Sequence, residues 1–263
     1  MSHVTLYNIK DIMINALIID DEIKARHILA NYLETMIPEE MTIRQARSVD
    51  QAVEVMKTFK PGLIFLDVEM PGKFGFELLA GRKNPDFDII FITAFNKYAI
   101  QAIRFSALDY LLKPICVEEL RSAIERHIEK VKEKNARPSQ VLLDNLMDNI
   151  KKKEIKDFRL AVPSSEGVFF FMLDEILRLE ADKNYTSIHL VGKRPFVSSK
   201  TLKHFDEMLA DFNFIRTHKS HLVNSRYIKQ VSHNSQYVLL SDGSQVEVSR
   251  RKKEEVQQQL NLR

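Results

Sequence analysis

Two apolar runs of this 263-residue chain end in carboxylates. Ala16–Ile19 is followed directly by Asp20 and Asp21, and Leu63–Leu66 is followed by Asp67. If both runs are neighbouring parallel strands, their carboxyl ends lie at one edge of a sheet, where open α/β folds bind ligands. Carboxylates that lie a few ångströms apart repel one another unless a cation lies between them. The pattern therefore predicts a cation site at this edge.

Two further polar residues fall at strand ends in the same half of the chain. Thr93 ends the run Ile89–Ile92, and Lys113 lies just beyond the run Ala107–Leu111. Mg²⁺ takes oxygen ligands and keeps several waters, so a carboxylate site would leave room for phosphate oxygens. Lys113 and the ion would neutralise a phosphoryl group, Thr93 would donate to one of its oxygens, and one carboxylate would be the attacking nucleophile. We therefore predict a phosphorylation site that needs a metal.

Short β-branched runs alternate with helical patterns through the first half. Strands are expected at Asn15–Ile19, Met41–Ala46, Leu63–Leu66, Ile89–Ile92 and Ala107–Leu111, and helices near Ile23–Met36, Val49–Phe59, Phe74–Ala80, Lys97–Arg104 and Val117–Lys134. Five β–α units in succession predict an α/β domain whose parallel sheet is covered by helices on both faces. Residues 1–14 are expected to be a tail, and 135–156 a helical linker with a short helix over Val141–Lys151.

Residues 15–134 resemble the receiver domain of bacterial two-component response regulators, through Asp20-Asp21, Asp67, Thr93 and Lys113-Pro114. The resemblance implies a flavodoxin-like, doubly wound (βα)5 fold. It also implies that Asp67 accepts a phosphoryl group from a histidine kinase. The domain would then be a phosphoacceptor regulator rather than an enzyme, with room only for slow self-dephosphorylation.

The same resemblance implies a metal site and a switch. Thr93 would be drawn toward the phosphoryl group, and Tyr110 would swing inward to fill the space behind the fourth strand. The remodelled face would favour a homodimer on activation, through a shift in the population of two states. The implied ligands of Mg²⁺ are the side chains of Asp21 and Asp67, the backbone carbonyl of Glu69 and, through a bridging water, Asp20.

An aspartyl-phosphate phosphatase is the alternative for the first half. The stretch Asp67-Val68-Glu69 is superficially similar to the Asp-x-Asp pattern of haloacid-dehalogenase-like hydrolases. That likeness would place the nucleophile on the first strand, whereas Asp67 follows the third strand and the acidic pair lies upstream. The order of the elements therefore favours regulation over turnover.

From residue 157 onward the hydrophobic period changes to that of strands. Short alternating runs predict a mostly antiparallel β domain over 157–263, with helices over Thr201–Ala210 and Arg250–Leu260, and Ser241–Ser244 is typical of a hairpin turn. Residues 131–263 contain 23 Lys and Arg against 17 Asp and Glu, and from Lys183 onward the numbers are 14 against 7. The second half is therefore the candidate for a polyanionic partner.

Residues 157–260 resemble a LytTR-type DNA-binding domain, most clearly over Phe212–Val231 (FNFIRTHKSHLVNSRYIKQV). The resemblance implies that loops on a β scaffold contact the bases of double-stranded DNA, with no recognition helix. Basic loops can contact guanine edges and phosphates. Either Tyr185 or Thr186 is expected to make the first base contact, and His218 to contact phosphate or make structural hydrogen bonds. The candidate DNA-contacting residues are Lys183, Asn184, Tyr185, Thr186, His218, Lys219, Arg250, Arg251 and Lys252.

A protein-interaction or RNA-binding module is the alternative for the second half. Aromatic residues near the basic loops are sparse, and single-stranded bases need them for stacking, so duplex DNA is favoured. The chain lacks an apolar run near the ~20 residues of a membrane-spanning helix and lacks a signal-peptide pattern. With a single cysteine, Cys116, it is expected to be cytoplasmic and without membrane insertion. The sequence thus predicts a phosphorylation-controlled transcription regulator.

Overall fold

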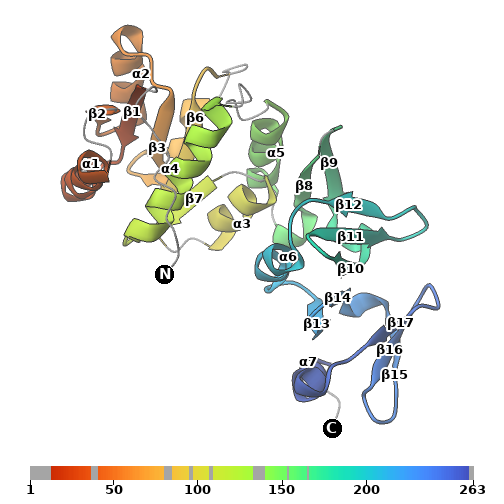
Figure 1. Cartoon of the computed structure of the whole chain (residues 1–263). Coiled ribbons are helices and arrows are strands. Elements are labelled where there is room, and N and C mark those ends of the chain that lie inside the picture. Colours follow the sequence, from red (N-terminus) through yellow and green to blue (C-terminus); the bar gives the residue numbers. More distant parts are fainter. Residues whose placement is uncertain are drawn as a thin grey trace. The chain divides into compact units, whose positions relative to one another are not determined.

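The computed structural model describes residues 13–36, 41–79, 85–94, 97–106, 109–132, 140–152, 154–164 and 166–260 (Figure 1). The chain divides into two compact units, Met1–Lys151 and Lys152–Arg263. Most of the predicted tail, residues 1–12, lies outside the described residues. In the part of the chain that the structure describes, no helix has both the length and the apolar character needed to cross a membrane.

The first unit is built on a parallel sheet in the order β2-β1-β3-β6-β7. Its strands are β1 (Ile14–Ile19), β2 (Met41–Ala46), β3 (Leu63–Asp67), β6 (Asp88–Thr93) and β7 (Asp109–Leu112). The central strands are buried on both faces, which is why their sequences are continuous apolar runs. The strand order is that of a flavodoxin-like doubly wound fold, which confirms the fold predicted for this half.

The register of the sheet brings the strand ends level with one another. Ile19 pairs with Leu66, so the residues that follow them, Asp20 and Asp67, lie next to each other. On the other side of β3, Asp67 pairs with Ile92 of β6. The predicted polar residues therefore meet at the carboxyl edge of the sheet.

Helices cover the two faces of this sheet. They are α1 (Ile23–Met36), α2 (Val49–Thr58), α3 (Lys97–Phe105) and α4 (Val117–Lys132). Figure 1 shows α4 lying across the strands. Leu29 and Leu33 of α1 share one buried cluster with Leu120 and Ile124 of α4 and with Phe65 of β3. This core holds the acidic edge in place, because both helices begin close to the strand ends that carry it.

The helix predicted over Phe74–Ala80 is confirmed in part, as a 3₁₀ helix over Gly75–Leu79, and Ala80 lies outside the described residues. β4 (Glu69–Met70) and β5 (Lys73–Phe74) form a short antiparallel pair, and a 3₁₀ helix, η1, spans Gly75–Leu79. The chain folds back on the end of β3 before this 3₁₀ helix begins.

Gly75 is the residue that permits this return. Its N–H donates to the carbonyl of Val68 at 3.0 Å. A Cβ atom at Gly75 would lie 1.9 Å from the carbonyl oxygen of Asp67 and 3.2 Å from Cδ1 of Leu66. The backbone therefore packs directly against the end of β3, at the residue predicted to be the phosphoacceptor.

Helix α5 (Gln140–Ile150) lies within the segment predicted as a linker, but it belongs to the first unit. It packs against α3 (Figure 1). Its buried Asn145 donates through Nδ2 to Oγ of Ser106 at 3.2 Å and to the carbonyl of Phe105 at 3.4 Å. The helix predicted over Val141–Lys151 is confirmed, and its packing adds a helix to the surface of α3.

The second unit is mostly antiparallel β, as predicted. A hairpin of β8 (Arg159–Ser164) and β9 (Gly167–Met172) precedes a sheet in the order β12-β11-β10-β14-β13 and a sheet in the order β15-β16-β17. The five-stranded sheet consists of β10 (Ile176–Asp182), β11 (Tyr185–Leu190), β12 (Phe196–Ser198), β13 (Phe214–His218) and β14 (His221–Asn224). The three-stranded sheet consists of β15 (Ile228–Val231), β16 (Tyr237–Leu240) and β17 (Gln245–Glu247).

The remaining elements in the described residues of this unit are two α-helices and four short 3₁₀ segments. They are α6 (Leu202–Leu209), α7 (Lys253–Gln259), η2 (Ile155–Asp157), η3 (Leu173–Glu175), η4 (Ser225–Tyr227) and η5 (Arg250–Lys252). Val223 and Ile215 of the larger sheet, Val238 and Val246 of the smaller one, and Val256 of α7 share one core. The predicted turn at Ser241–Ser244 is confirmed, with Gly243 at φ 86°.

Replacing Gly75 with alanine should destabilise the first unit. Because a Cβ atom would collide with backbone rather than with a flexible side chain, we expect Gly75→Ala to lower the free energy of unfolding by about 3 kcal/mol. Urea denaturation followed by circular dichroism measures this change. Gly62→Ala is the matched control, because its Cβ atom would have no neighbour within 4 Å. Equal stability of the two variants would contradict the close approach.

Candidate functional sites

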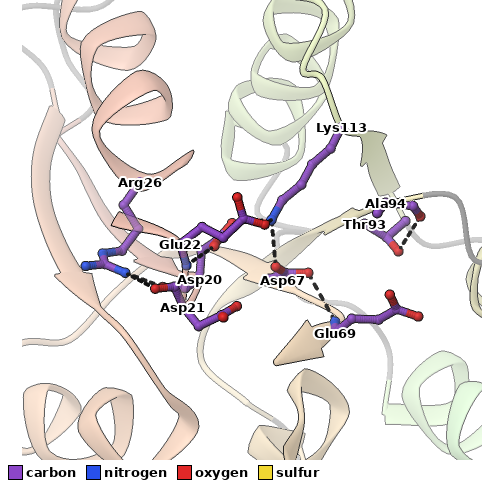
Figure 2. A network of polar contacts seen from close by, with 9 residues as sticks. All are labelled: Asp20, Asp21, Glu22, Arg26, Asp67, Glu69, Thr93, Ala94 and Lys113. Carbon is purple, nitrogen blue, oxygen red and sulfur yellow. Dashed lines mark hydrogen bonds and ion pairs between the residues drawn. The ribbon is translucent and has the colours of Figure 1, made fainter. Parts of the chain in front are cut away.

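Three carboxylates converge at the carboxyl edge of the first sheet (Figure 2). Asp20, Asp21 and Asp67 each place one oxygen so that the three oxygens lie within 4.8 Å of one another. Asp20 and Asp67 are 2% exposed, while Asp21 reaches solvent. Hard oxygen donors at this spacing suit a small divalent cation that keeps some of its waters. The structure thus brings together the acidic residues that the sequence singled out.

Lys113 enters the same cluster from the end of β7 (Figure 2). Its Nζ lies 2.8 Å from Oδ2 of Asp20 and 2.8 Å from Oδ2 of Asp67, and 3.4 Å from Oε1 of Glu22. Only 18% of its side chain is exposed, and the peptide bond to Pro114 is cis. The ammonium group is therefore the positive charge that two buried carboxylates share.

The protonation of this cluster follows from burial and from these contacts. Burial raises the pKa of the Asp67 carboxyl, and the hydrogen bonds from Lys113 and from the Glu69 N–H offset only part of the increase. For Lys113, burial alone would lower the pKa, but the hydrogen bonds to Asp20 and Asp67 outweigh burial and raise the pKa of its ammonium group. Lys113 therefore stays charged, and a cation near Asp67 would favour its ionised form.

Backbone contacts hold the acidic turn after β1 in its shape. Arg26 of α1 donates through Nη1 to the carbonyl oxygens of Asp20, at 2.5 Å, and of Asp21, at 3.1 Å. The N–H of Glu22 donates to Oδ1 of Asp20 at 2.8 Å. Arg26 was not among the predicted residues, because an arginine on a helix carries no sequence signal for contact with a carbonyl one turn earlier. Its guanidinium also adds positive charge beside the acids.

The two predicted switch residues lie on β6 and β7. Thr93 is fully buried, and its hydroxyl donates to the carbonyl of Ala94 at 2.8 Å (Figure 2). The hydroxyl of Tyr110 accepts a hydrogen bond from Nε of Arg104 at 2.7 Å, and the guanidinium lies 5.1 Å from the ring centroid. Arg104 belongs to α3, so Tyr110 is tied to that helix. Arg104 and Tyr110 also line a groove of about 400 Å³ together with Glu118.

The predicted DNA-contacting residues gather at one end of the five-stranded sheet. The β10–β11 turn and the β13–β14 turn are joined by a hydrogen bond from the N–H of Ala181 to the carbonyl of Ser220, at 2.9 Å. The N–H of Ser249, just before η5, donates to the carbonyl of Thr217 at 2.9 Å. Three segments that are distant in sequence, 183–185, 218–219 and 250–252, therefore form one basic surface, called here the loop cluster.

The side chains of the loop cluster differ in exposure. Lys183, Asn184, Lys219, Arg250 and Arg251 are exposed. Lys252 is half-buried and pairs with Glu255, which partly neutralises it.

Two of the predicted residues have structural contacts that decide between the alternatives. Thr186 is fully buried, and its hydroxyl donates to the carbonyl of Lys200 at 2.8 Å. The prediction of a DNA contact by its side chain is therefore wrong, whereas the neighbouring Tyr185 is 54% exposed. Nδ1 of His218 lies 2.6 Å from Oγ of Ser220 and accepts from the Ser220 N–H at 3.3 Å. This nitrogen of His218 thus supports the turn.

Lys183 stands out by its backbone conformation. Its φ is 54°, in the left-handed region that non-glycine residues enter at an energetic cost. Glycine would adopt this conformation freely. Lys183 lies at the tip of the β10–β11 turn, and among the described non-glycine residues it shares this conformation with Ser235.

Comparisons with known proteins match both units. Residues 16–125 match the model of the response regulator receiver domain, and residues 166–261 match the LytTr DNA-binding domain. The sensory transduction protein LytT of Bacillus subtilis (strain 168) is 31% identical over 95% of this chain and 100% of its own length. The transcriptional regulatory protein LytR of Staphylococcus aureus (strain bovine RF122 / ET3-1) is 29% identical over 89% and 94%.

Among solved structures, a two-component transcriptional regulator AraC from Clostridium phytofermentans ISDg is 29% identical, with a TM-score of 0.41 over 47% of this chain and 98% of that chain. The relatives, by contrast, extend over nearly the whole sequence, receiver and DNA-binding halves together. The chain therefore belongs to the LytT/LytR family of two-component response regulators, which are transcriptional regulators composed of a receiver domain and a LytTR DNA-binding domain.

Proposed function

We propose that phosphorylation of Asp67, in the presence of Mg²⁺, controls the binding of specific duplex DNA by the loop cluster. The observation that carries this proposal is the shared position of Lys113 between the buried carboxylates of Asp20 and Asp67. With three carboxylates and one ammonium group, the site is two positive charges short of neutrality without an ion. The site is therefore suited to a divalent cation. After phosphorylation, the divalent cation and the ammonium group of Lys113 could together hold the dianionic phosphoryl group.

The phosphoryl transfer would use the oxygens already in place. One carboxylate oxygen of Asp67 attacks the phosphorus of a phosphohistidine on the kinase. The new P–O bond replaces the P–N bond, and the imidazole leaves with its electron pair and takes up a proton. Lys113 would then hold a phosphoryl oxygen.

The metal would be held by Asp21, Asp67 and the Glu69 carbonyl, with Asp20 acting through water. When bound, Mg²⁺ would supply charge neutralisation to the transferring phosphoryl group. Arg26 supports this arrangement, because it fixes the carbonyls of the acidic pair and leaves their carboxylates directed to the site.

A route from the site to α5 runs through residues with defined contacts. Thr93 would exchange the Ala94 carbonyl for a phosphoryl oxygen, and Tyr110 would leave Arg104 to fill the space behind β6. Arg104 lies one residue before Phe105, whose carbonyl accepts from Asn145 of α5. A movement of α3 would therefore displace α5 through this hydrogen bond. The groove beside Tyr110 lies on the face where a second copy would dock on activation.

Exchange of Asp67 for asparagine should abolish phosphoryl uptake, because the nucleophilic oxygen is removed. After incubation with acetyl phosphate and Mg²⁺, we expect intact-mass spectrometry to detect a phosphorylated form of the chain that retains Asp67. We expect no phosphorylated form of the Asp67→Asn variant. Chelation of the metal should give the same loss. The control is Asp50→Asn, an exposed acid that pairs with Lys73. Labelling of Asp67→Asn equal to that of the control would refute Asp67 as the acceptor.

Exchange of Asn145 for alanine should uncouple α5 from α3. Loss of its two hydrogen bonds costs about 1–2 kcal/mol, so we expect the ratio of DNA dissociation constants before and after phosphorylation to approach one. Fluorescence anisotropy with a duplex selected from a random pool measures both constants. Asp144→Ala, an exposed position of the same helix, should keep the ratio. An unchanged ratio in Asn145→Ala would show that α5 is not on the route.

Exchange of Lys183 for glycine should separate stability from binding. Relief of the left-handed strain should raise the free energy of unfolding by about 1 kcal/mol. Loss of one phosphate contact should weaken binding and lower the slope of log K against log salt by about 1. Lys229→Ala removes an exposed lysine of β15 outside the loop cluster and should leave that slope unchanged. Equal slopes for the two variants would count against a DNA contact by Lys183.

A further inference from the structure

The β13–β14 turn lacks the residues that usually shape such a turn. His218 pairs with His221, which leaves Lys219 and Ser220 as a two-residue connection. Two-residue hairpin turns that match the twist of their strands need a positive φ at one or both positions, hence the usual glycine or asparagine. Neither Lys219 nor Ser220 has a positive φ. The turn therefore depends on contacts from outside its own backbone.

Arg216 makes two such contacts, in addition to the support that Nδ1 of His218 gives to Ser220. Its Nε donates to the carbonyl of His218 at 2.7 Å, and its Nη2 donates to the carbonyl of Lys219. On its other side, Nη1 donates to Oδ2 of Asp206 at 3.1 Å and to the carbonyl of Leu202 at 3.4 Å. All three nitrogens of one planar guanidinium are thus bound to acceptors of the protein, and 15% of the side chain is exposed. This arrangement ties the turn to α6.

The position of the irregularity in β13 explains why the arginine can reach the turn. The pairing of β13 with β14 shifts between Arg216 and His218, so that Thr217 is an extra residue in the strand. Such a bulge bends the strand and redirects its side chains. The guanidinium group reaches the carbonyls of both His218 and Lys219.

We propose that Arg216 is a positioning residue for DNA recognition. It holds the Lys219–Ser220 turn in its binding shape and couples that turn to α6, without touching DNA itself. This inference rests on the proposed DNA-binding function of the loop cluster. A preorganised turn loses less conformational freedom on binding. The contacts of Arg216 with the turn and with α6, called here the clamp, should therefore raise affinity for the preferred sequence more than the general attraction to phosphate.

A clamp and a phosphate contact make different predictions for Arg216→Met. Loss of a phosphate contact would weaken binding to all sequences alike and lower the salt slope by about 1. Loss of a clamp should leave the salt slope unchanged and reduce affinity for the preferred duplex by roughly 10-fold or more. The affinity for the preferred duplex should then approach the affinity for a scrambled duplex. Arg216→Lys should behave like Arg216→Met, because a single ammonium group cannot span acceptors on the turn and on α6.

The test uses the full chain, treated with acetyl phosphate and Mg²⁺, and anisotropy titrations of a duplex selected from a random pool and of its scrambled form at several salt concentrations. Arg226→Met, which removes an exposed arginine outside the loop cluster, is the matched control and should retain the preference. Asp206→Asn keeps Arg216 but weakens its anchor, and should cause a smaller loss in the same direction. Hydrogen exchange over 217–222 should accelerate in the Arg216 variants.

The outcomes separate the inference from the function on which it rests. If the phosphorylated chain without substitutions selects no preferred duplex, the proposed DNA-binding function fails, and the proposed role of Arg216 fails with it. If that chain selects one and Arg216→Lys and Asp206→Asn keep the preference, only the proposed role of Arg216 is overturned. A lowered salt slope in Arg216→Met would also overturn it, in favour of a direct phosphate contact.

Discussion

The placement of one ammonium group between two buried carboxylates is the interaction on which the first unit depends. Asp20 and Asp67 end neighbouring strands, and each lies 2.8 Å from Nζ of Lys113. A buried charge that lost its partner would cost roughly 3–5 kcal/mol, so the ends of β1, β3 and β7 are held together electrostatically. The same contact leaves Lys113 close to the oxygen that would carry a phosphoryl group. The contact of Lys113 with Asp20 and Asp67 thus both stabilises the edge of the sheet and places an ammonium group where a phosphoryl group would bind.

In the second unit, by contrast, positively charged side chains lie close together. Lys183, Lys219 and Arg251 come from three separate segments, and backbone hydrogen bonds from Ala181 and Ser249 hold these segments together. Exposed side chains of like charge repel one another, but water and salt screen that repulsion. Although Glu255 pairs with Lys252, the exposed cations of the surface can therefore stay close together, and a polyanion can supply the opposite charge.

Some features of the fold and of the site could be predicted from the sequence, because they leave a physical pattern in it, and others could not. Asp20, Asp67 and Lys113 could be predicted to meet, because the ends of parallel strands share one edge whatever the details of packing. The 3₁₀ form of the helix at Gly75–Leu79 could not be predicted from the pattern of apolar residues, and the close approach of Gly75 to Asp67 is visible only in the structure. The expected DNA contact of Thr186 failed for a similar reason, because alternation along a strand indicates a buried face only once the register is known.

The sequence by itself determined the kinds of chemistry at each strand end: carboxylates for a cation, a lysine and a threonine for a phosphoryl group, and a basic second half. Only the tertiary structure decided which groups are buried and which partners they have. Arg26 on the carbonyls of the acidic turn and Arg216 on the carbonyls of the β13–β14 turn belong to this second class. Their contacts depend on the direction of a side chain toward the backbone, and hydrophobic periodicity carries no information about that direction.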